Sequence, residues 1–386
     1  MLKVSSRASI IGPCLIHPRL DSTATTFGDL LDRLNYYGKV LCEVSNGRYK
    51  KLVILAGLAD SSFELFNKSN YEFLEIIRLG DSTINSISFG FKASRFLRKT
   101  KSSPNILIAG DLWVGLPASL MMKLLSRKNM AIQASLHGDP LSVGIGYKFR
   151  IKKVIKQFLL KFLLKRVDSI RVVSRHLADA LAQKYGVPQD NIFIAPIPLK
   201  LSTEHRLTKT GEDIAIIGRL HEERGLRESL SIMTSFIESG KSPNILVIGE
   251  GPLSILVNEW KIGVQNSAEI SVLGQLKRNE LENLWPRIQI LLSSALQEGY
   301  GMTIREAILQ GTAVIARENQ GTLELKETFS EAIHLYRTEQ EAVNLLLSLS
   351  GITYPESTII SYRKMQTLMD RESTNKLIAS WISEGY

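Results

Sequence analysis

The stretch of residues 294–307 constrains the fold of this chain more than any other part of it. An apolar run of strand length, residues 288–292, leads into a Gly-x-Gly turn, and a helix is predicted to begin at about Met302. The first turn of a helix has free N–H groups and the positive end of a dipole, which suit a phosphate, and glycines let a ligand approach the backbone. Glu298 before the helix and Glu306 inside it are placed to bind hydroxyls on either side of that phosphate. We therefore expect this junction to bind a phosphate flanked by two polyols, as in a nucleotide sugar.

A rival interpretation makes Glu298 and Glu306 the acid and the nucleophile of a glycosidase. Eight residues span about 12 Å along a helix, whereas retaining hydrolases need about 5 Å between the two carboxyl groups and inverting ones about 6.5–9.5 Å. Because Glu298 precedes the helix, this geometry disfavours the pair but does not exclude it.

Short apolar runs alternate with helix-like stretches along the whole chain. The runs of strand length in the first half are residues 8–11, 52–55, 106–109, 131–136 and 169–173, and the helix-like stretches are residues 27–37, 84–97, 116–125 and 149–165. A second series begins at Ile214 and continues through residues 245–247, 270–273, 290–292 and 314–316. This alternation predicts an α/β protein with doubly wound parallel sheets.

The length of 386 residues allows two domains, each with its own core. We predict the boundary near Pro196 and Pro198, because these prolines and the polar residues after them disfavour regular structure. The first domain is then expected over residues 1–198 and the second over residues 199–365. Residues 357–386 read as helical.

Charge and cysteine content indicate the kind of partner and the compartment. The net charge of +10 favours phosphorylated substrates or anionic lipid; nucleic acid fits poorly, because no nucleic-acid-binding motif occurs. Two cysteines, Cys14 and Cys42, fit a reducing compartment. With no apolar stretch of signal-peptide or membrane-spanning length, we expect a cytoplasmic protein.

Residues 147–166 form a strongly basic stretch. They carry eight lysines and arginines, and no acidic residue lies between Pro140 and Val167. Apolar residues recur at helical spacing within the stretch. The pattern fits a helix that lies on an anionic membrane, and it fits equally a core-facing helix with a basic outer face. The first alternative would place the protein on the inner face of the membrane.

Several motifs together resemble a known family. They are Gly218-Arg219-Leu220 with Arg224-Gly225, a strand and Gly-Glu-Gly-Pro turn at residues 246–252, a strand ending at Gly274, Glu298-Gly-Tyr-Gly with Glu306-Ala, and residues 311–316. The set resembles the retaining glycosyltransferases of the GT-B fold, family 4 (glycosyl transferases group 1), over about residues 130–330. The resemblance implies two Rossmann-like domains facing a cleft, the first on the acceptor side and the second binding the nucleotide sugar. It also implies that the helix of about residues 366–386 packs back on the first domain.

The resemblance assigns roles to individual residues. The residues expected to act in catalysis are Arg219, Arg224, Glu298 and His137, and those expected to bind the donor are Glu306, Gly301, Met302, Thr303, Gly218, Gly249 and Gly274. A guanidinium can donate hydrogen bonds to two phosphate oxygens at once, so Arg219 and Arg224 suit a leaving diphosphate. The alternative is that they are two exposed arginines on a solvated turn. Arg224 stands where the family usually has lysine, which keeps the charge but changes the geometry.

Two features of the first half remain open. His137 follows a predicted strand, at the sheet end that faces a ligand in open α/β folds; it either contacts the donor sugar and acceptor, as the resemblance implies, or caps a loop. The hydroxyl-rich loop of residues 20–28 replaces the paired-glycine loop of many family members. It either caps the next helix or binds the acceptor.

The sequence thus favours a retaining glycosyltransferase that moves a hexose-type sugar from a nucleotide diphosphate sugar to a hydroxyl of a glycan or lipid-linked acceptor. By resemblance, no metal and no cofactor other than this co-substrate are required. Three alternatives remain: a non-catalytic nucleotide-sugar-binding subunit, an epimerase or hydrolase of the same fold, and a basic membrane-surface or RNA-binding scaffold. The last gives no reason for the pattern from Glu298 to Glu306.

Overall fold

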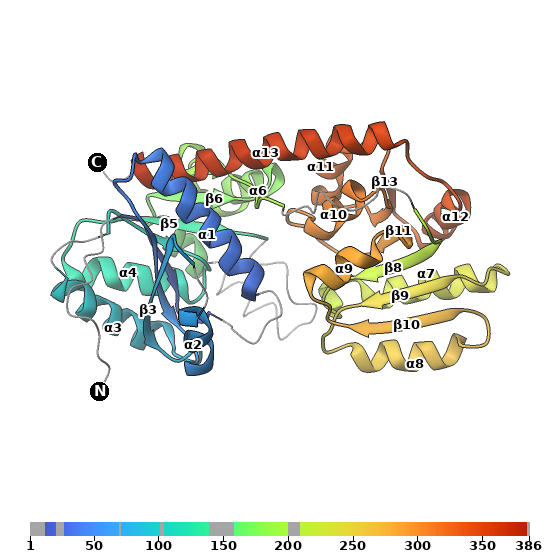
Figure 1. The fold of residues 1–386 in the computed structure, drawn as a ribbon, viewed down its shortest axis with the longest axis horizontal. Coiled ribbons are helices and arrows are strands. Elements are labelled where there is room, and N and C mark those ends of the chain that lie inside the picture. Colours follow the sequence, from blue (N-terminus) through green and yellow to red (C-terminus); the bar gives the residue numbers. More distant parts are fainter. Residues whose placement is uncertain are drawn as a thin grey trace. The chain divides into compact units, whose positions relative to one another are not determined.

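The computed structural model describes residues 12–20, 27–68, 71–100, 104–138, 158–199 and 209–383. The chain forms two compact units (Figure 1): unit 1 comprises residues 1–197 and 371–386, and unit 2 comprises residues 198–370. Each unit is built on its own parallel sheet. The prediction of two doubly wound parallel sheets is therefore confirmed.

Unit 1 contains a seven-stranded sheet with the strand order β3-β2-β1-β4-β5-β6-β7. Its strands are β1 (Cys14–His17), β2 (Leu52–Gly57), β3 (Leu74–Gly80), β4 (Ile106–Ala109), β5 (Ala131–Leu136), β6 (Ser169–Val172) and β7 (Ile192–Ile194). The labelled helices that connect them are α1 (Phe27–Val44), α2 (Asp60–Lys68), α3 (Ser86–Lys99), α4 (Gly115–Ser126) and α6 (Arg175–Tyr185). A further helix covers residues 158–164.

The central strands of unit 1 are apolar because helices cover both faces of a parallel sheet. Every residue of β2 and β4 is buried. One face packs against α1 and against the end of the long helix α13 (Glu356–Ser383), which contributes Leu377, Ile378 and Trp381 to the core. Helix α13 thus begins in unit 2 and ends in unit 1.

Unit 2 contains a six-stranded sheet with the strand order β10-β9-β8-β11-β12-β13. Its strands are β8 (Asp213–Ile217), β9 (Asn244–Ile248), β10 (Glu269–Gly274), β11 (Ile288–Ser293), β12 (Ala313–Arg317) and β13 (Ile333–Tyr336). The helices before α13 are α7 (Leu226–Glu238), α8 (Ser254–Val264), α9 (Arg278–Leu284), α10 (Met302–Leu309), α11 (Gln320–Thr328) and α12 (Glu339–Leu349).

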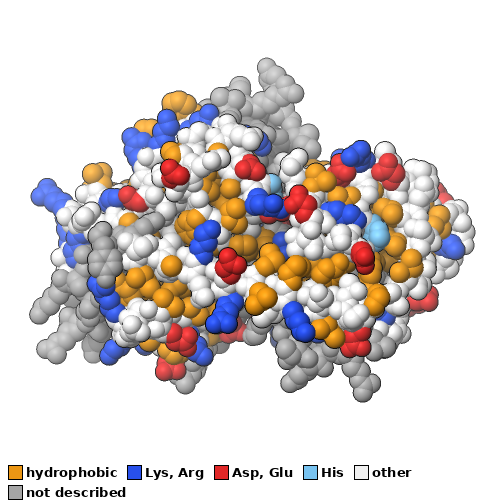
Figure 2. Space-filling model, turned by 90° about the horizontal axis from the view of Figure 1, so that it is seen from above, with side chains coloured by type: hydrophobic (Ala, Val, Ile, Leu, Met, Phe, Trp, Pro, Cys, Tyr) orange, Lys and Arg blue, Asp and Glu red, His pale blue; other side chains and the backbone are white. Residues whose placement is uncertain are grey.

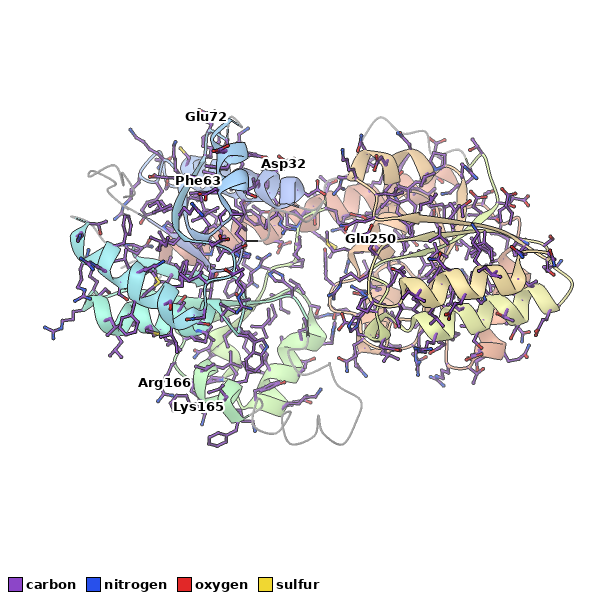
Figure 3. All side chains as sticks on the ribbon, turned by 90° about the horizontal axis from the view of Figure 1, so that it is seen from below. Asp32, Phe63, Glu72, Lys165, Arg166 and Glu250 are labelled. Atoms are coloured by element: carbon purple, nitrogen blue, oxygen red, sulfur yellow. The ribbon has the colours of Figure 1, made fainter. Side chains whose placement is uncertain are left out.

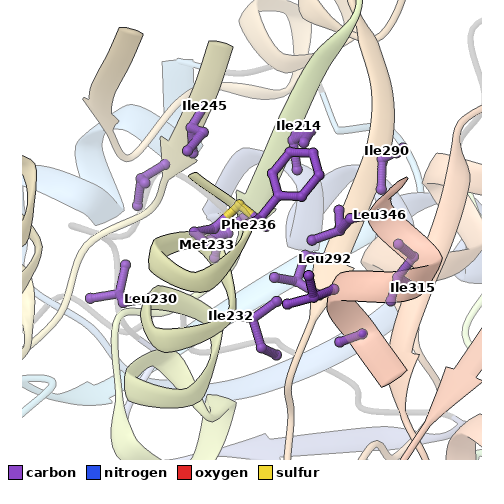
Figure 4. Close-up of a cluster of buried hydrophobic side chains, with 14 of the residues drawn as sticks. Ile214, Leu230, Ile232, Met233, Phe236, Ile245, Ile290, Leu292, Ile315 and Leu346 are labelled. Atoms are coloured by element: carbon purple, nitrogen blue, oxygen red, sulfur yellow. The ribbon is translucent and has the colours of Figure 1, made fainter. Parts of the chain in front are cut away.

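One face of the second sheet packs against α7 and α12. Met233 and Phe236 of α7 lie against strand residues such as Ile214, and Leu346 of α12 completes the cluster (Figure 4). These side chains are almost fully buried. The close packing fixes the strand ends from which the loops of the candidate site emerge.

The strand order places a switch point in each sheet. In unit 2 the chain passes from β8 through β9 to β10 in one direction and then returns to place β11 on the other side of β8. In unit 1 the same change of direction separates β1 from β4. Ligands of open α/β sheets bind outside the carboxyl ends of the strands at such points.

The described surface also shows how the positive charge is distributed. On the face seen in Figure 2, basic, acidic and apolar side chains are interspersed, with no large area of one sign. The net charge of +10 is therefore not concentrated on that face. Within the described ranges, no helix combines the length and the apolar character needed to cross a membrane.

Candidate functional site

A pocket lies at the switch point of unit 2, outside the carboxyl ends of β8 and β11. Its space of about 450 Å³ includes a part that is open to solvent. Five residues that the sequence singled out line it: Gly218, Arg219, Arg224, Glu298 and Thr303. The structure thus brings together residues that lie up to 85 positions apart in the chain.

The loop after β8 is shaped by glycines. The φ angle of Gly218 is 147°, and that of Gly249, after the neighbouring β9, is 135°. A Cβ atom on Gly249 would lie 1.9 Å from the carbonyl oxygen of Gly218. Position 249 therefore requires glycine because the two loops cross in direct backbone contact, whereas position 218 favours glycine because of its positive φ.

A second close approach positions Arg224. It ends a short 3₁₀ turn, Glu222–Arg224, and is followed by Gly225 with a φ of 63°. A Cβ atom on Gly225 would lie 1.9 Å from the carbonyl oxygen of Ser294, just after β11. The turn is thus held against the end of β11, and Arg224 projects into the pocket from it.

Arg224 and Glu298 form an ion pair across the pocket. Arg224 Nη1 donates to Glu298 Oε2 at 3.0 Å. The other carboxylate oxygen, Oε1, accepts from the backbone N–H groups of Gly299 and Gly301, each at 3.2 Å. Glu298 is largely buried and Arg224 is partly exposed, so the carboxylate is fixed while the guanidinium still faces the open space.

Arg219 is held less tightly. Its Nη2 donates to Glu223 Oε1 at 2.5 Å, and 71% of its side chain is exposed. Surface ion pairs of this kind contribute about 0–1 kcal/mol to stability. Arg219 is therefore free to reorient toward an anion in the pocket.

Helix α10 begins at the pocket with its amide groups uncapped by any side chain. Its N-cap, Gly301, has a φ of 74°, and a Cβ atom there would lie 2.6 Å from Leu325 Cδ1. The predicted helix start at Met302 is confirmed. The first turn, which includes Thr303, offers N–H groups and the positive end of the helix dipole to the pocket.

A buried arginine supports this turn from beneath. Arg305 Nε donates to the carbonyl oxygen of Tyr300 at 3.0 Å, its Nη1 donates to Gln366 Oε1, and its guanidinium lies 4.1 Å from the centre of the Tyr300 ring. Burial lowers the pKa of Arg305, and the nearby Tyr300, Glu324 and Asp370 oppose that effect. The sequence analysis did not single out Arg305; its only signal is a charged residue on an otherwise apolar helix face.

The remaining predicted donor residues lie at the same end of the sheet. Gly249 and Gly274 follow or end β9 and β10, and Gly249 N donates to the carbonyl oxygen of Gly274 at 2.7 Å. Glu306 lies on α10 with its Oε1 3.7 Å from Arg278 Nη2. Glu306 is not among the residues that line the pocket, so its expected role in binding ribose stays a prediction.

His137 belongs to unit 1, where it directly follows β5. Its side chain is exposed at the surface. Desolvation by the protein, and after it the positive charges of Arg171 and Arg33, lowers the pKa of His137 to about 3. His137 is thus neutral at physiological pH. The neighbouring Asp139 lies outside the described residues, as do residues 21–26 of the hydroxyl-rich loop.

Several partners in unit 2 escaped the sequence analysis. Glu223 and Arg278 pair with Arg219 and Glu306, respectively. Under the pocket, Ser294 Oγ accepts hydrogen bonds from Tyr336 Oη at 2.7 Å and from Ser229 Oγ at 2.8 Å. Glu223 had a visible signal, four residues after Arg219. The contacts of Arg278 and Ser294 had no such signal, because they depend on which elements meet at the end of the sheet.

Comparison with known families gives two successive matches. The Glycosyltransferase Family 4 model matches residues 67–202, and the Glycosyl transferases group 1 model matches residues 200–349. Among solved structures, the lipopolysaccharide outer core galactosyltransferase WaaB in its apo form superimposes with a TM-score of 0.68 at 13% identity, covering 96% of this chain and 99% of that one. HepE from Anabaena in complex with UDP-glucose superimposes with a TM-score of 0.66 at 13% identity and with the same coverage. At 13% sequence identity, these two superpositions establish the fold of the chain and nothing beyond it.

Curated relatives match over part of their length. The O-antigen chain mannosyltransferase RfbU of Salmonella typhimurium is 20% identical over 242 residues, which are 61% of this chain and 65% of that protein. The 2-deoxystreptamine glucosyltransferase of Streptomyces kanamyceticus is 22% identical over 223 residues, 54% of this chain and 57% of that protein. The chain thus spans less than two thirds of the curated relatives it matches.

Proposed function

This chain belongs to the family 4 glycosyltransferases (glycosyl transferases group 1) with the GT-B fold, and we propose that it is a retaining hexosyltransferase. The donor is a nucleotide diphosphate sugar, and the acceptor is a hydroxyl of a growing glycan or of a lipid-linked saccharide. Unit 2 binds the donor and unit 1 carries the acceptor.

The observation that carries this proposal is the pocket of unit 2. It combines two guanidinium groups, Arg219 and Arg224, with the uncapped first turn of α10. Cleavage of the donor places negative charge on a diphosphate, and fixed positive groups that stabilise a developing charge contribute much of a rate enhancement. Glu298, paired with Arg224, is positioned to accept hydrogen bonds from sugar hydroxyls.

In the proposed reaction, the acceptor hydroxyl attacks the anomeric carbon on the face from which the diphosphate leaves. The bond from the anomeric carbon to the diphosphate oxygen breaks, the bond to the acceptor oxygen forms, and a phosphate oxygen takes the hydroxyl proton. Arg219, Arg224 and the amides of Met302 and Thr303 stabilise the leaving diphosphate. No carboxylate nucleophile is required, and His137, which is neutral, donates or accepts a hydrogen bond without carrying charge.

Uridine is the base to test first. HepE from Anabaena, which has the same fold, forms complexes with UDP and with UDP-glucose. Glu306, at the end of the first turn of α10, is the residue proposed to bind the ribose hydroxyls, as the family resemblance implies. The pocket itself does not distinguish among hexoses.

A donor panel tests the proposal. Purified protein is incubated with UDP- and GDP-hexoses with and without candidate acceptor glycans, and mass spectrometry measures nucleotide release and product mass. A transferase releases nucleotide only when an acceptor gains a hexose. Nucleotide release or an altered donor without an acceptor supports the hydrolase or epimerase alternative. Binding of every donor without turnover supports the non-catalytic subunit.

We also propose that the described half of the basic stretch contacts an anionic membrane. In residues 158–164, Leu160, Leu163 and Leu164 are buried, while Phe158 and Phe162 remain exposed. The Arg166 guanidinium lies over the Phe162 ring at 3.4 Å, and Figure 3 shows Lys165 and Arg166 at the outer edge of unit 1. Exposed aromatic rings beside basic groups suit the interface of anionic lipids. Residues 147–157 lie outside the described part of the chain.

Co-sedimentation with vesicles tests this contact. The double variant Phe158→Ser and Phe162→Ser should bind vesicles of phosphatidylglycerol and phosphatidylcholine about tenfold more weakly than the wild type. The matched control is Ile255→Ser and Ile262→Ser on α8, since these side chains are also strongly exposed. Equal binding by the two double variants would contradict the assignment of this helix.

A further inference from the structure

The switch point of unit 1 carries its own cluster of polar side chains. β1 ends at His17, and the backbone N–H of Gly110, just after the adjacent β4, donates to the carbonyl oxygen of Ile16 at 3.3 Å. His137 follows β5 at the same end of the sheet. Arg33 of α1 and Arg171 of β6 lie close enough to His137 to act on it electrostatically. The cluster therefore combines two guanidinium groups and two imidazoles.

Among the described residues, no carboxylate forms an ion pair with the guanidinium groups of this cluster. Arg171 is buried and donates to the backbone carbonyl oxygens of Ala195 at 2.8 Å and Pro196 at 3.1 Å, with no carboxylate as partner. Within the described part of the chain, Arg33 forms no ion pair. Asp29, one turn earlier on α1, acts on Arg33 only at longer range.

A described carboxylate that acts on this cluster, Asp111, already accepts hydrogen bonds from the backbone. Asp111 Oδ1 accepts from the backbone N–H groups of Trp113 at 2.9 Å and Val114 at 2.6 Å, and its Oδ2 accepts from Gly115 N at 3.0 Å. Asp111 thus caps the start of α4. Its charge acts on His17 electrostatically, but its oxygens are occupied by the helix.

Two buried polar atoms of the cluster lack hydrogen-bond partners among the described residues. They are Nδ1 of His17 and the hydroxyl group of Tyr37, which lies one turn after Arg33 on α1. Buried polar atoms are hydrogen-bonded in the great majority of native proteins. Both atoms can donate a hydrogen bond, so both fit an acceptor-rich ligand.

The charges of the cluster act on His137, which is its solvent-exposed member. Desolvation is the largest cause of the lowered pKa of His137. The charges of Arg171, Arg33 and His17 lower this pKa further. The imidazole thus experiences a positive environment, and an anion bound beside it would reverse part of this effect.

We propose that His17, Arg33 and His137 form an anion site that holds a phosphate or carboxylate group of the acceptor, with Arg171 and Tyr37 behind them. This inference rests on the proposed transferase function, in which unit 1 carries the acceptor. It deepens that function by assigning the acceptor a negative charge near the reacting hydroxyl. The exposed position of His137 gives such a group access from solvent.

Histidine NMR tests the anion site. The chain has six histidines, which selective isotope labelling and single substitutions assign. Inorganic phosphate and glucuronate are titrated separately against sodium chloride at matched ionic strength. At least one of the two anions should shift the signals of His17 and His137 saturably and raise the apparent pKa of His137, because a bound anion stabilises the imidazolium. The histidines of unit 2, such as His334, serve as internal references.

A pair of variants on α1 locates the effect. Arg33→Ala should weaken anion binding at His137 about tenfold or more, since it removes a charged hydrogen-bond donor, and Arg33→Lys should restore part of it. Lys39→Ala makes the same charge change on the same helix, where Lys39 is exposed and pairs with Glu43 at 3.9 Å, and it should leave binding unchanged. No saturable shift beyond that of chloride, or equal effects of Arg33→Ala and Lys39→Ala, would overturn the proposal.

Calorimetry on the same samples separates this inference from the proposed function. If the protein binds UDP-glucose while neither anion affects His137, the anion site is wrong and the transferase proposal stands. If no nucleotide sugar of the donor panel binds, the transferase proposal fails, and the assignment of this site to an acceptor fails with it.

Discussion

Replacing Arg219 by alanine separates the role of this residue in turnover from its role in stability. Arg219 is 71% exposed, and among the described residues its ion-pair partner is Glu223, which is four residues further along the chain. An exposed pair of this kind contributes about 0–1 kcal/mol to the free energy of unfolding. Arg219→Ala should therefore fold normally and keep its urea midpoint nearly unchanged.

Turnover should respond quite differently. If Arg219 stabilises the leaving diphosphate, removing its charge should lower kcat about 10²-fold, which corresponds to about 2.7 kcal/mol of transition-state free energy. This loss exceeds the expected change in stability severalfold. The two effects are therefore separable in one protein preparation.

The matched control is Arg227→Ala. Arg227 Nε lies 3.0 Å from Glu222 Oε1, and 60% of its side chain is exposed, but Arg227 does not line the pocket. Steady-state nucleotide release with the best donor and acceptor should fall for Arg219→Ala and stay within twofold for Arg227→Ala. Normal turnover by Arg219→Ala, or equal loss in both variants, would refute the assigned role of Arg219.

Four further substitutions test the packing and the electrostatics of the fold. Gly249→Ala should lower the free energy of unfolding by about 3 kcal/mol or more, because the new Cβ would meet the Gly218 carbonyl oxygen at 1.9 Å; an unchanged urea midpoint would contradict the close backbone contact. Phe236→Ala should cost about 3–5 kcal/mol by urea unfolding, whereas Phe158→Ala, at an exposed position, should stay within about 0.5 kcal/mol. Burial raises the pKa of Asp370 from 3.8 to about 6, so between these pH values the folded state binds more protons than the unfolded state and stability falls as the pH rises. Asp370→Asn should flatten this part of the pH dependence, and an unchanged slope would speak against the raised pKa.

The sequence predicts the buried strands well because parallel strands covered on both faces are continuously apolar. Residues 106–109 and 131–136 coincide with β4 and β5. β3 was missed because it is the edge strand and is only partly buried, with Glu75 and Arg78 within it. β1 (Cys14–His17) was also missed, because the apolar run predicted as the first strand ends at Ile11, before Pro13. The strand predicted at residues 8–11 lies outside the described residues.

The site was predictable to the extent that it depends on backbone motifs. The glycine at Gly301 and the helix start at Met302 follow from turn chemistry and helix geometry, which are local, whereas Gly218 was identified through the family resemblance. The ion pair of Arg224 with Glu298 and the support of Tyr300 by Arg305 join side chains whose meeting depends on how the loops cross at the strand ends. Such contacts are set by tertiary packing, which periodicity in the sequence does not encode.

Hydrogen–deuterium exchange with and without UDP is the most direct test that a diphosphate binds at the start of α10. The amides of residues 299–304 and 218–220 should exchange more slowly when UDP is present, because the diphosphate accepts hydrogen bonds from the helix start and orders the loop after β8. Binding of UDP with protection elsewhere and none at these amides would contradict the account.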